Sequence, residues 1–163
     1  MMNAAKYPSV SSSSLLLLLV SMSFLMVCGR AAVVQQCPPS FLISPCVCSL
    51  SDGLAAVTCS GLTSLQSLVD VFQRSFPTDE LDRVTVSGSQ LAPLPDNVFG
   101  TKSFRSVEFS ANRGLSVVNE RVLEASRARL ETLVVRHDSD GWSFSLNNVA
   151  GFAALRSLQA GRH

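Results

Sequence analysis

The side chains best suited to chemistry are four neighbouring residues near the C-terminus and a set of cysteines near the N-terminus. His137, Asp138, Ser139 and Asp140 are the residue types of a hydrolytic triad or of a divalent-ion site. A triad is assembled from separate elements, and adjacent side chains diverge. The cluster also has too few oxygen ligands for a calcium loop, so we interpret it as a solvated turn. Because no phosphate-binding glycine loop and no H-E-x-x-H helix occurs, the sequence predicts no enzyme, no cofactor and no metal.

Four cysteines lie close together, at Cys37, Cys46, Cys48 and Cys59, and the fifth, Cys28, lies in a segment that we expect to be removed. In an oxidising compartment four cysteines form two disulfides. Of the three possible pairings, the one that joins Cys46 to Cys48 strains the disulfide torsion. We favour Cys37 with Cys48 and Cys46 with Cys59, because interlocked short loops stabilise a segment with little core, by about 2 to 4 kcal/mol for each bridge. A four-thiolate zinc site is the alternative, but its usual C-x-x-C spacing is absent.

The N-terminus indicates a secretory signal peptide over residues 1–31. Lys6 precedes an apolar run from Leu15 to Val27, and the small residues Gly29 and Ala31 allow cleavage after either one. This run is too short to span a bilayer, which needs roughly 20 apolar residues, so a membrane anchor is the weaker alternative. We therefore expect a secreted, extracellular protein that is not inserted in a membrane after cleavage.

A repeated apolar pattern begins at Leu81, Phe104, Leu130 and Leu155. Each copy approximates L-x-x-L-x-L-x-x-N-x-L, in which a short strand points alternate side chains inward and an asparagine bonds the backbone where the chain turns. Asn112 occupies the asparagine position, whereas Ser89 and Asp138 replace it in other copies. The copies recur at the roughly 20 to 29 residue spacing of leucine-rich repeats.

These patterns predict an α/β-type solenoid. We expect a right-handed leucine-rich-repeat horseshoe with short parallel strands on its concave face and an irregular or helical convex side. A disulfide-bonded cap over residues 37–60 would cover its N-terminal end, and residues 61–80 would form a degenerate first repeat or helix. The repeats would follow as residues 81–103, 104–129 and 130–154 and a partial unit, 155–163, so the C-terminal end is expected to be truncated.

The cysteine block C-x8-C-x-C-x10-C, followed by these repeats, resembles the N-terminal cap of extracellular leucine-rich-repeat proteins. Within residues 37–163, the segments PCVCSLSDGLAAVTCSG, VFQRSF, VSGSQLAPLPDNVF and FSANRGLS are similar to a group of secreted arthropod proteins, well represented in crustaceans. This group is the family of Oplophorus-luciferin 2-monooxygenase non-catalytic subunits. The resemblance implies a leucine-rich-repeat protein that does not itself catalyse light emission. The chain departs from the family pattern because it lacks a C-terminal cysteine cap.

The strand residues between the buried positions would face the concave side, which is the usual binding surface of solenoids. These residues are Arg83, Thr85, Ser87, Ser106, Glu108, Ser110, Thr132, Val134, Arg136, Ser157 and Gln159. The face is polar and mixed in sign, without the aromatic or clustered arginine anchors of a tight interface. It is therefore either a modest binding surface or an ordinary solvated one. The single tryptophan, Trp142, either packs under a loop or serves as an exposed binding anchor.

Three interpretations of function remain open. The first is a secreted, non-catalytic protein that mediates protein–protein interaction and stabilises or accompanies a partner. The second is a fragment of an extracellular adhesion, matrix or innate-immune recognition protein. The third is a fragment without a stable function, because its last strand is an uncapped edge. Binding to nucleic acid is not expected, because 13 basic and 12 acidic side chains give a formal net charge of only +1 and form no basic cluster.

Overall fold

The computed structural model describes residues 36–162 except 75, 92, 116–117, 119 and 138–148, all within the compact unit Val34–His163. The predicted signal peptide lies outside the described residues. The described helices and strands are, in chain order, α2 (Ser40–Ile43), β1 (Cys46–Ser51), β2 (Leu54–Ser60), α3 (Leu65–Arg74), β3 (Glu80–Ser87), β4 (Ser103–Ser110), η2 (Glu124–Ser126), β5 (Thr132–His137) and β6 (Ser157–Arg162).

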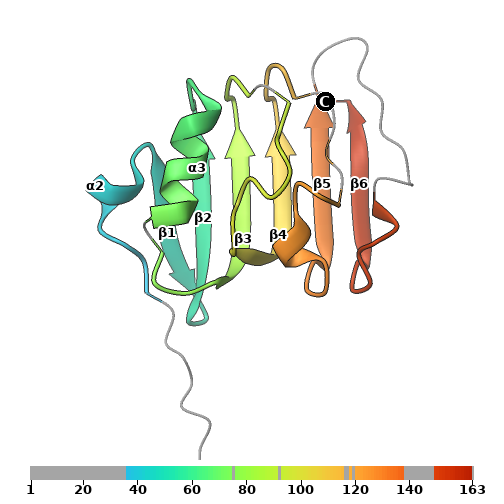
Figure 1. Cartoon of the computed structure of the whole chain (residues 1–163), viewed down its shortest axis with the longest axis horizontal. Helices are drawn as coiled ribbons and strands as arrows, with labels where there is room; N and C mark the ends of the chain where they lie inside the picture. The colour runs from blue at the N-terminus through green and yellow to red at the C-terminus, as the bar shows by residue number, and fades with distance from the viewer. Residues whose placement is uncertain are drawn as a thin grey trace, which may run out of the picture. The chain divides into compact units, whose positions relative to one another are not determined.

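The six strands form one sheet and follow one another in chain order (Figure 1). β1 pairs antiparallel with β2, and each later strand pairs parallel with the one before it. Asp52 and Gly53 connect β1 to β2 with φ values of 53° and 76°, as a two-residue type I′ hairpin turn requires. Each parallel connection instead has to cross one face of the sheet, and Figure 1 shows α3 and the segment between β3 and β4 in front of the strands.

Two rows of apolar side chains run across the sheet and form its core. Alternate residues of each strand point to the same face, so registered positions collect in rows. The register aligns Val57, Val84, Val107, Leu133 and Leu158 in one row and Cys59, Val86, Phe109, Val135 and Ala160 in the other. From β2 to β5 every member of both rows is at most 1% exposed. Burial of these rows supplies the main driving force for stacking the strands in this register.

Phenylalanines fix α3 against the same core. Phe72, on the buried side of α3, is fully buried. Its ring stacks on Phe76 at a centroid distance of 5.5 Å and meets Phe99 and Phe104 edge-on at 5.0 and 5.6 Å. Offset and edge-on ring pairs are the favourable arrangements for aromatic quadrupoles. The cluster therefore joins α3 to β4 and to the segment that precedes it.

The prediction of a leucine-rich-repeat horseshoe is wrong. The structure is a mixed six-stranded sheet that opens with an antiparallel hairpin, and it is not a solenoid with a helical convex side. Among the described residues α3 is the only helix longer than four residues, and it precedes the predicted repeats. After β3 the chain contains Pro93 and Pro95, and Asn97 has a φ of 53°. Neither proline nor a left-handed residue continues an α-helix, so this connection consists of turns.

Two disulfides cross-link the N-terminal part of the described chain, one from the segment before β1 to the β1–β2 hairpin and one between the two strands of the hairpin. One links Cys37 to Cys48 and the other links Cys46 to Cys59. Cys46 and Cys59 are registered partners on the two strands, with Cα atoms 4.1 Å apart. Both are buried, so this disulfide is part of the core as well as a covalent cross-link.

Candidate functional site

The eleven residues that were predicted to face the concave side all lie on one face of the sheet. Along each strand they alternate with the residues of the two buried rows. The register places them in three lines across β3 to β6: Arg83, Ser106, Thr132 and Ser157; Thr85, Glu108, Val134 and Gln159; and Ser87, Ser110 and Arg136. We call this set the polar face. Most of its members are half-buried, and Arg83 and Gln159 are exposed. The period of two that buries Val84 and Val86 is what points their neighbours outward.

The charged part of the polar face is a small network centred on Arg136. Its guanidinium lies 3.4 Å from Glu108 Oε1 and donates to Gln159 Oε1 at 3.5 Å. An ion pair this accessible contributes little to stability, at most about 1 kcal/mol. Val134, the apolar member of the face, lies between Glu108 and Gln159 in the register and is 8% exposed. The contacts with Glu108 and Gln159 therefore hold the Arg136 side chain over β4, β5 and β6 and add little to the stability of the fold.

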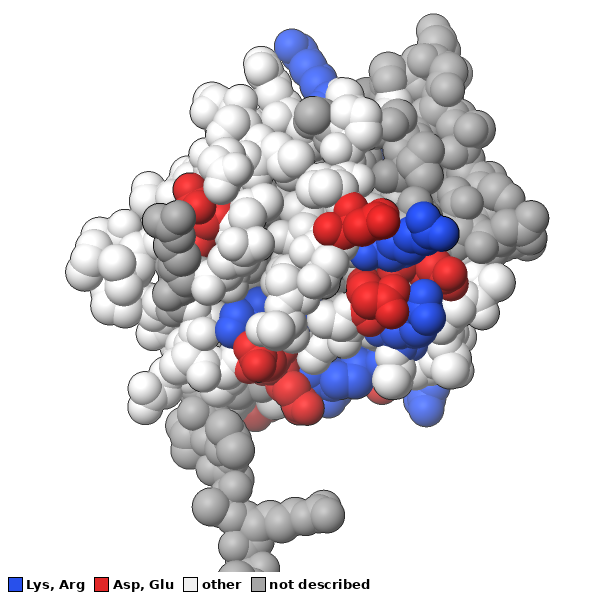
Figure 2. Space-filling model, in the orientation of Figure 1, with Lys and Arg blue, Asp and Glu red and all other residues white. Residues whose placement is uncertain are grey.

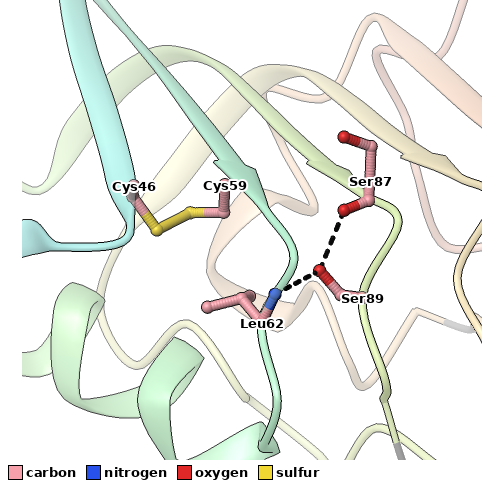
Figure 3. Close-up of a disulfide and its surroundings, with 5 residues drawn as sticks. All are labelled: Cys46, Cys59, Leu62, Ser87 and Ser89. Carbon is pink, nitrogen blue, oxygen red and sulfur yellow. Dashed lines mark hydrogen bonds between the residues drawn. A yellow bond between two sulfur atoms is a disulfide. The ribbon is translucent and has the colours of Figure 1, made fainter.

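A chain of hydrogen bonds ties the turns after β2, β3 and β4 to one another. Figure 3 shows the part of it that joins Leu62 to Ser89 and Ser89 to Ser87. The Leu62 N–H donates to Ser89 Oγ at 3.0 Å, and the Ser89 N–H donates to Asn112 Oδ1 at 3.0 Å. Ser89 Oγ donates to the Ser87 carbonyl at 2.9 Å, and Asn112 Nδ2 donates to the Val86 carbonyl at 2.8 Å. Each side chain thus satisfies backbone groups that would otherwise be buried without a partner.

A hollow of about 570 Å³ lies beside these turns. It is lined by Gly88, Ser89, Gln90, Ala111, Asn112, Arg113 and Gly114. The polar atoms of Ser89 and Asn112 are already engaged with the backbone. Among the residues that line it, none is a carboxylate, histidine or cysteine that could act as a general base. The hollow offers the exposed guanidinium of Arg113 and hydrogen-bonding groups, but no acid–base pair.

The cluster at residues 137–140, which the sequence analysis interpreted as a solvated turn, is only partly within the described residues. His137 is 5% exposed, and its Nε2 lies 3.1 Å from the Leu115 carbonyl oxygen. Asp138, Ser139, Asp140 and Trp142 lie outside the described residues. The structure therefore places His137 in the core at the end of β5 and does not address the other four.

Lys102 is a buried cation that the sequence analysis missed. Its Nζ donates to the carbonyls of Phe76 and Thr78, both at 3.0 Å, and to Asp79 Oδ1 at 2.7 Å. The hydrogen bond from Lys102, and then the one from Thr101, hold the pKa of Asp79 below its ordinary value of 3.8. All three ammonium donors are engaged, so Lys102 ties the start of β4 to the segment before β3 and is not available as a nucleophile.

A row of alternating charges near the starts of four strands was also missed. Asp82, Arg105, Glu131 and Arg156 occupy equivalent positions, each next to registered residues of β3 to β6. Arg105 lies 3.5 Å from Asp82 and 3.9 Å from Glu131. The sequence carried the signal, because each of the four directly follows the first apolar residue of its unit. Acidic and basic side chains are interleaved elsewhere too, as on the side of the molecule that Figure 2 displays.

The described residues include neither a candidate metal-binding group nor a candidate membrane-spanning helix. In the ranges that the structure covers, no group of three or more His, Cys, Asp or Glu side chains could hold a metal ion. No helix within those ranges has the length and apolar character needed to cross a membrane.

Comparison with known proteins adds one likeness. No family model matches the chain, and no solved structure matches it. The chain is similar to a curated protein of Oplophorus gracilirostris, with 24% identity over an alignment of 173 positions. The alignment covers 88% of this chain and 48% of the relative, so the chain spans about half the length of the curated relative it matches. That relative is the Oplophorus-luciferin 2-monooxygenase non-catalytic subunit.

Proposed function

We propose that the chain is a secreted, non-enzymatic protein that binds a partner protein through its polar face and accompanies that partner as a non-catalytic subunit. The observation that carries the proposal is the likeness to a protein named as a non-catalytic subunit, which extends over 88% of this chain. A subunit is by definition part of an assembly, so the likeness supports the existence of a protein partner. The partner itself is part of the proposal.

The composition of the polar face supports this role. Thr85, Ser87, Ser106 and Ser110 are short side chains on neighbouring strands, so a partner can approach the sheet closely there. Short hydroxyls also accept water-mediated hydrogen bonds, which are common in non-obligate interfaces. Arg136, held in place beside them, supplies an oriented cation for a partner's carboxylate or carbonyl groups.

The two disulfides support the secreted part of the proposal. Disulfides form and persist in oxidising compartments such as the extracellular space. The proposed signal peptide, residues 1–31, would direct the chain there. The intact mass of the protein collected from the medium of secreting cells tests this step. We expect cleavage after Gly29 or Ala31 and the mass loss of two disulfides, and retention of the full chain inside the cell would contradict secretion.

Co-elution with a partner tests the binding step. The secreted chain is cross-linked in secretions of its own source, the cross-linked polypeptide is identified by mass spectrometry, and the two are then purified together as recombinant proteins. Ser110→Arg and Thr85→Arg place bulk on the polar face and should abolish co-elution. Asp96→Arg is the control, because Asp96 is exposed on the segment between β3 and β4. Co-elution that survives both face variants would show that the partner binds elsewhere, and failure to cross-link any polypeptide would contradict the subunit role.

A further inference from the structure

The polar face continues from β3 across β2 and β1. Val47 is registered with Thr58 and Thr58 with Thr85, so these three residues lie in one row across the sheet. Ala56 extends the neighbouring row of Arg83 in the same way. Thr58 is exposed, and the Val47 side chain is 65% exposed although it is apolar. We call these five residues the β1–β3 patch.

Arg83 is the only charged residue of the β1–β3 patch. The sequences of β1 and β2, CVCSLS and LAAVTCS, contain no charged residue. The two carboxylates of β3 are engaged by other arginines. Asp82 lies 3.5 Å from Arg105, and Glu80 lies 3.6 Å from Arg129. Arg83 itself is exposed and has no ion pair with a described residue, so the patch carries an uncompensated positive charge.

The neighbours of Arg83 leave its guanidinium open to an incoming group. Its registered partners are the short side chains of Ala56 on β2 and Ser106 on β4. Thr85 follows on the same face, roughly 7 Å along the strand, and Val47 lies two strands away, at a Cα distance of roughly 12 Å. A guanidinium binds a carboxylate through two hydrogen bonds, and a nearby hydroxyl can donate a further one. The patch therefore combines a carboxylate-binding group with an exposed aliphatic side chain.

We propose that the β1–β3 patch docks a partner protein that presents an aspartate or glutamate side chain to Arg83 and an aliphatic side chain to Val47. This rests on the proposed function, because it names the chemistry by which the partner is held. Charge complementarity determines the acidic group, since a basic group would meet an uncompensated like charge. A nucleic acid or an anionic membrane does not fit, because these ligands need clustered cations and the patch has one.

Selection of random peptides displayed on phage tests the preference of the patch directly. The immobilised target is the secreted full chain. We expect the enriched peptides to combine an acidic residue with aliphatic residues, and we expect this enrichment to be lost on Arg83→Gln. Val47→Ser should reduce the aliphatic preference and keep the acidic one. Arg113→Gln, at an exposed arginine outside the polar face, is the matched control and should select the same peptides as wild type.

One enriched acidic peptide, made synthetically, then measures the strength of the interaction. Arg83→Gln should weaken its binding by roughly tenfold, because charge-assisted hydrogen bonds to the carboxylate are lost. A peptide with lysine in place of its acidic residue should bind Arg83→Glu better than wild type. Failure to enrich acidic peptides, or enrichment of the same peptides on Arg83→Gln, would overturn the proposal. A protein that sediments as a dimer dissociated by Arg83→Glu would also overturn it, because a second copy would then occupy the patch.

The natural partner separates this proposal from the proposed function. If the partner co-elutes equally with Arg83→Glu and wild type but not with Ser110→Arg, the patch proposal fails while the subunit function stands. If no partner is found but the selected peptides show the expected dependence on Arg83, the subunit function fails and the specificity of the patch stands.

Discussion

At the scale of single residues, Asn112 connects the turns most completely. Its amide accepts from Ser89 N–H and donates to the Val86 carbonyl, and it is 4% exposed. Asn112→Ala leaves two buried backbone groups without these partners and should lower the free energy of unfolding by about 2 to 3 kcal/mol. Urea denaturation followed by circular dichroism measures this loss. Asn112→Asp keeps the acceptor but not the donor and should fall between wild type and Asn112→Ala, whereas equal stability of all three proteins would contradict the role.

Asp79 is a second single residue with a testable role, because it makes the stability of the folded protein depend on pH. Its folded-state pKa lies below the ordinary value of 3.8, first because of the hydrogen bond from Lys102. A depressed folded pKa means that the ionised carboxylate stabilises the folded protein above about pH 4, and that this contribution is lost as pH falls through the folded pKa. Urea midpoints measured from neutral to acidic pH should therefore decline less steeply for Asp79→Asn than for wild type. Asp96→Asn, at an exposed carboxylate, is the control and should follow wild type. Parallel curves for Asp79→Asn and wild type would contradict the prediction.

At the scale of elements, α3 packs on the core through the buried side chains of Leu68, Val71 and Phe72, of which Phe72 is the largest. Phe72 is fully buried and touches three other phenylalanine rings. Phe72→Ala should lower the free energy of unfolding by about 3 to 5 kcal/mol, since it removes a large side chain and leaves a cavity. Gln73→Ala, at the exposed next residue of α3, should have little effect. A double-mutant cycle with Phe99→Ala should show a coupling of about 0.5 to 1.5 kcal/mol, and strict additivity would show that the ring contact is not energetically specific.

Some features of these strands and turns could be predicted from the sequence, and others could not. Alternation by two predicted the inward side chains of β3 and β4, because a strand must alternate its faces whatever the architecture around it. It could not predict the architecture, because the same buried rows fit both a horseshoe and the observed mixed sheet. Asp52 and Gly53 carried a hairpin signal of their own, which the cysteine spacing obscured. The ion pairs of Arg105 could have been predicted, because Asp82, Arg105 and Glu131 each directly follow the first apolar residue of a repeated unit and so share one register position.

At the scale of the whole molecule, the two sides of the sheet are secured differently. The β1 side is held by two disulfides, whereas at β6, the last strand that the structure describes, Leu158 is half-buried and Ala160 is exposed. Exposed sheet edges and short peripheral strands open most readily in native proteins. The stability contributions of the two cross-links can be separated because the linked cysteines differ in burial.

The two disulfides close loops of nearly equal length, with sequence separations of 11 and 13. Loop closure alone therefore predicts nearly the same contribution from each, about 3 kcal/mol. The sulfur atoms of Cys46 and Cys59 also belong to the core, since these residues are 3% and 0% exposed, whereas Cys37 and Cys48 are half-buried. The double variant Cys46→Ala/Cys59→Ala should consequently lose more stability than Cys37→Ala/Cys48→Ala, because it also removes packed atoms beside Val86. Thermal and urea unfolding of both variants, each with its remaining disulfide verified by intact mass, measures the difference. Equal losses would mean that loop closure alone accounts for both cross-links.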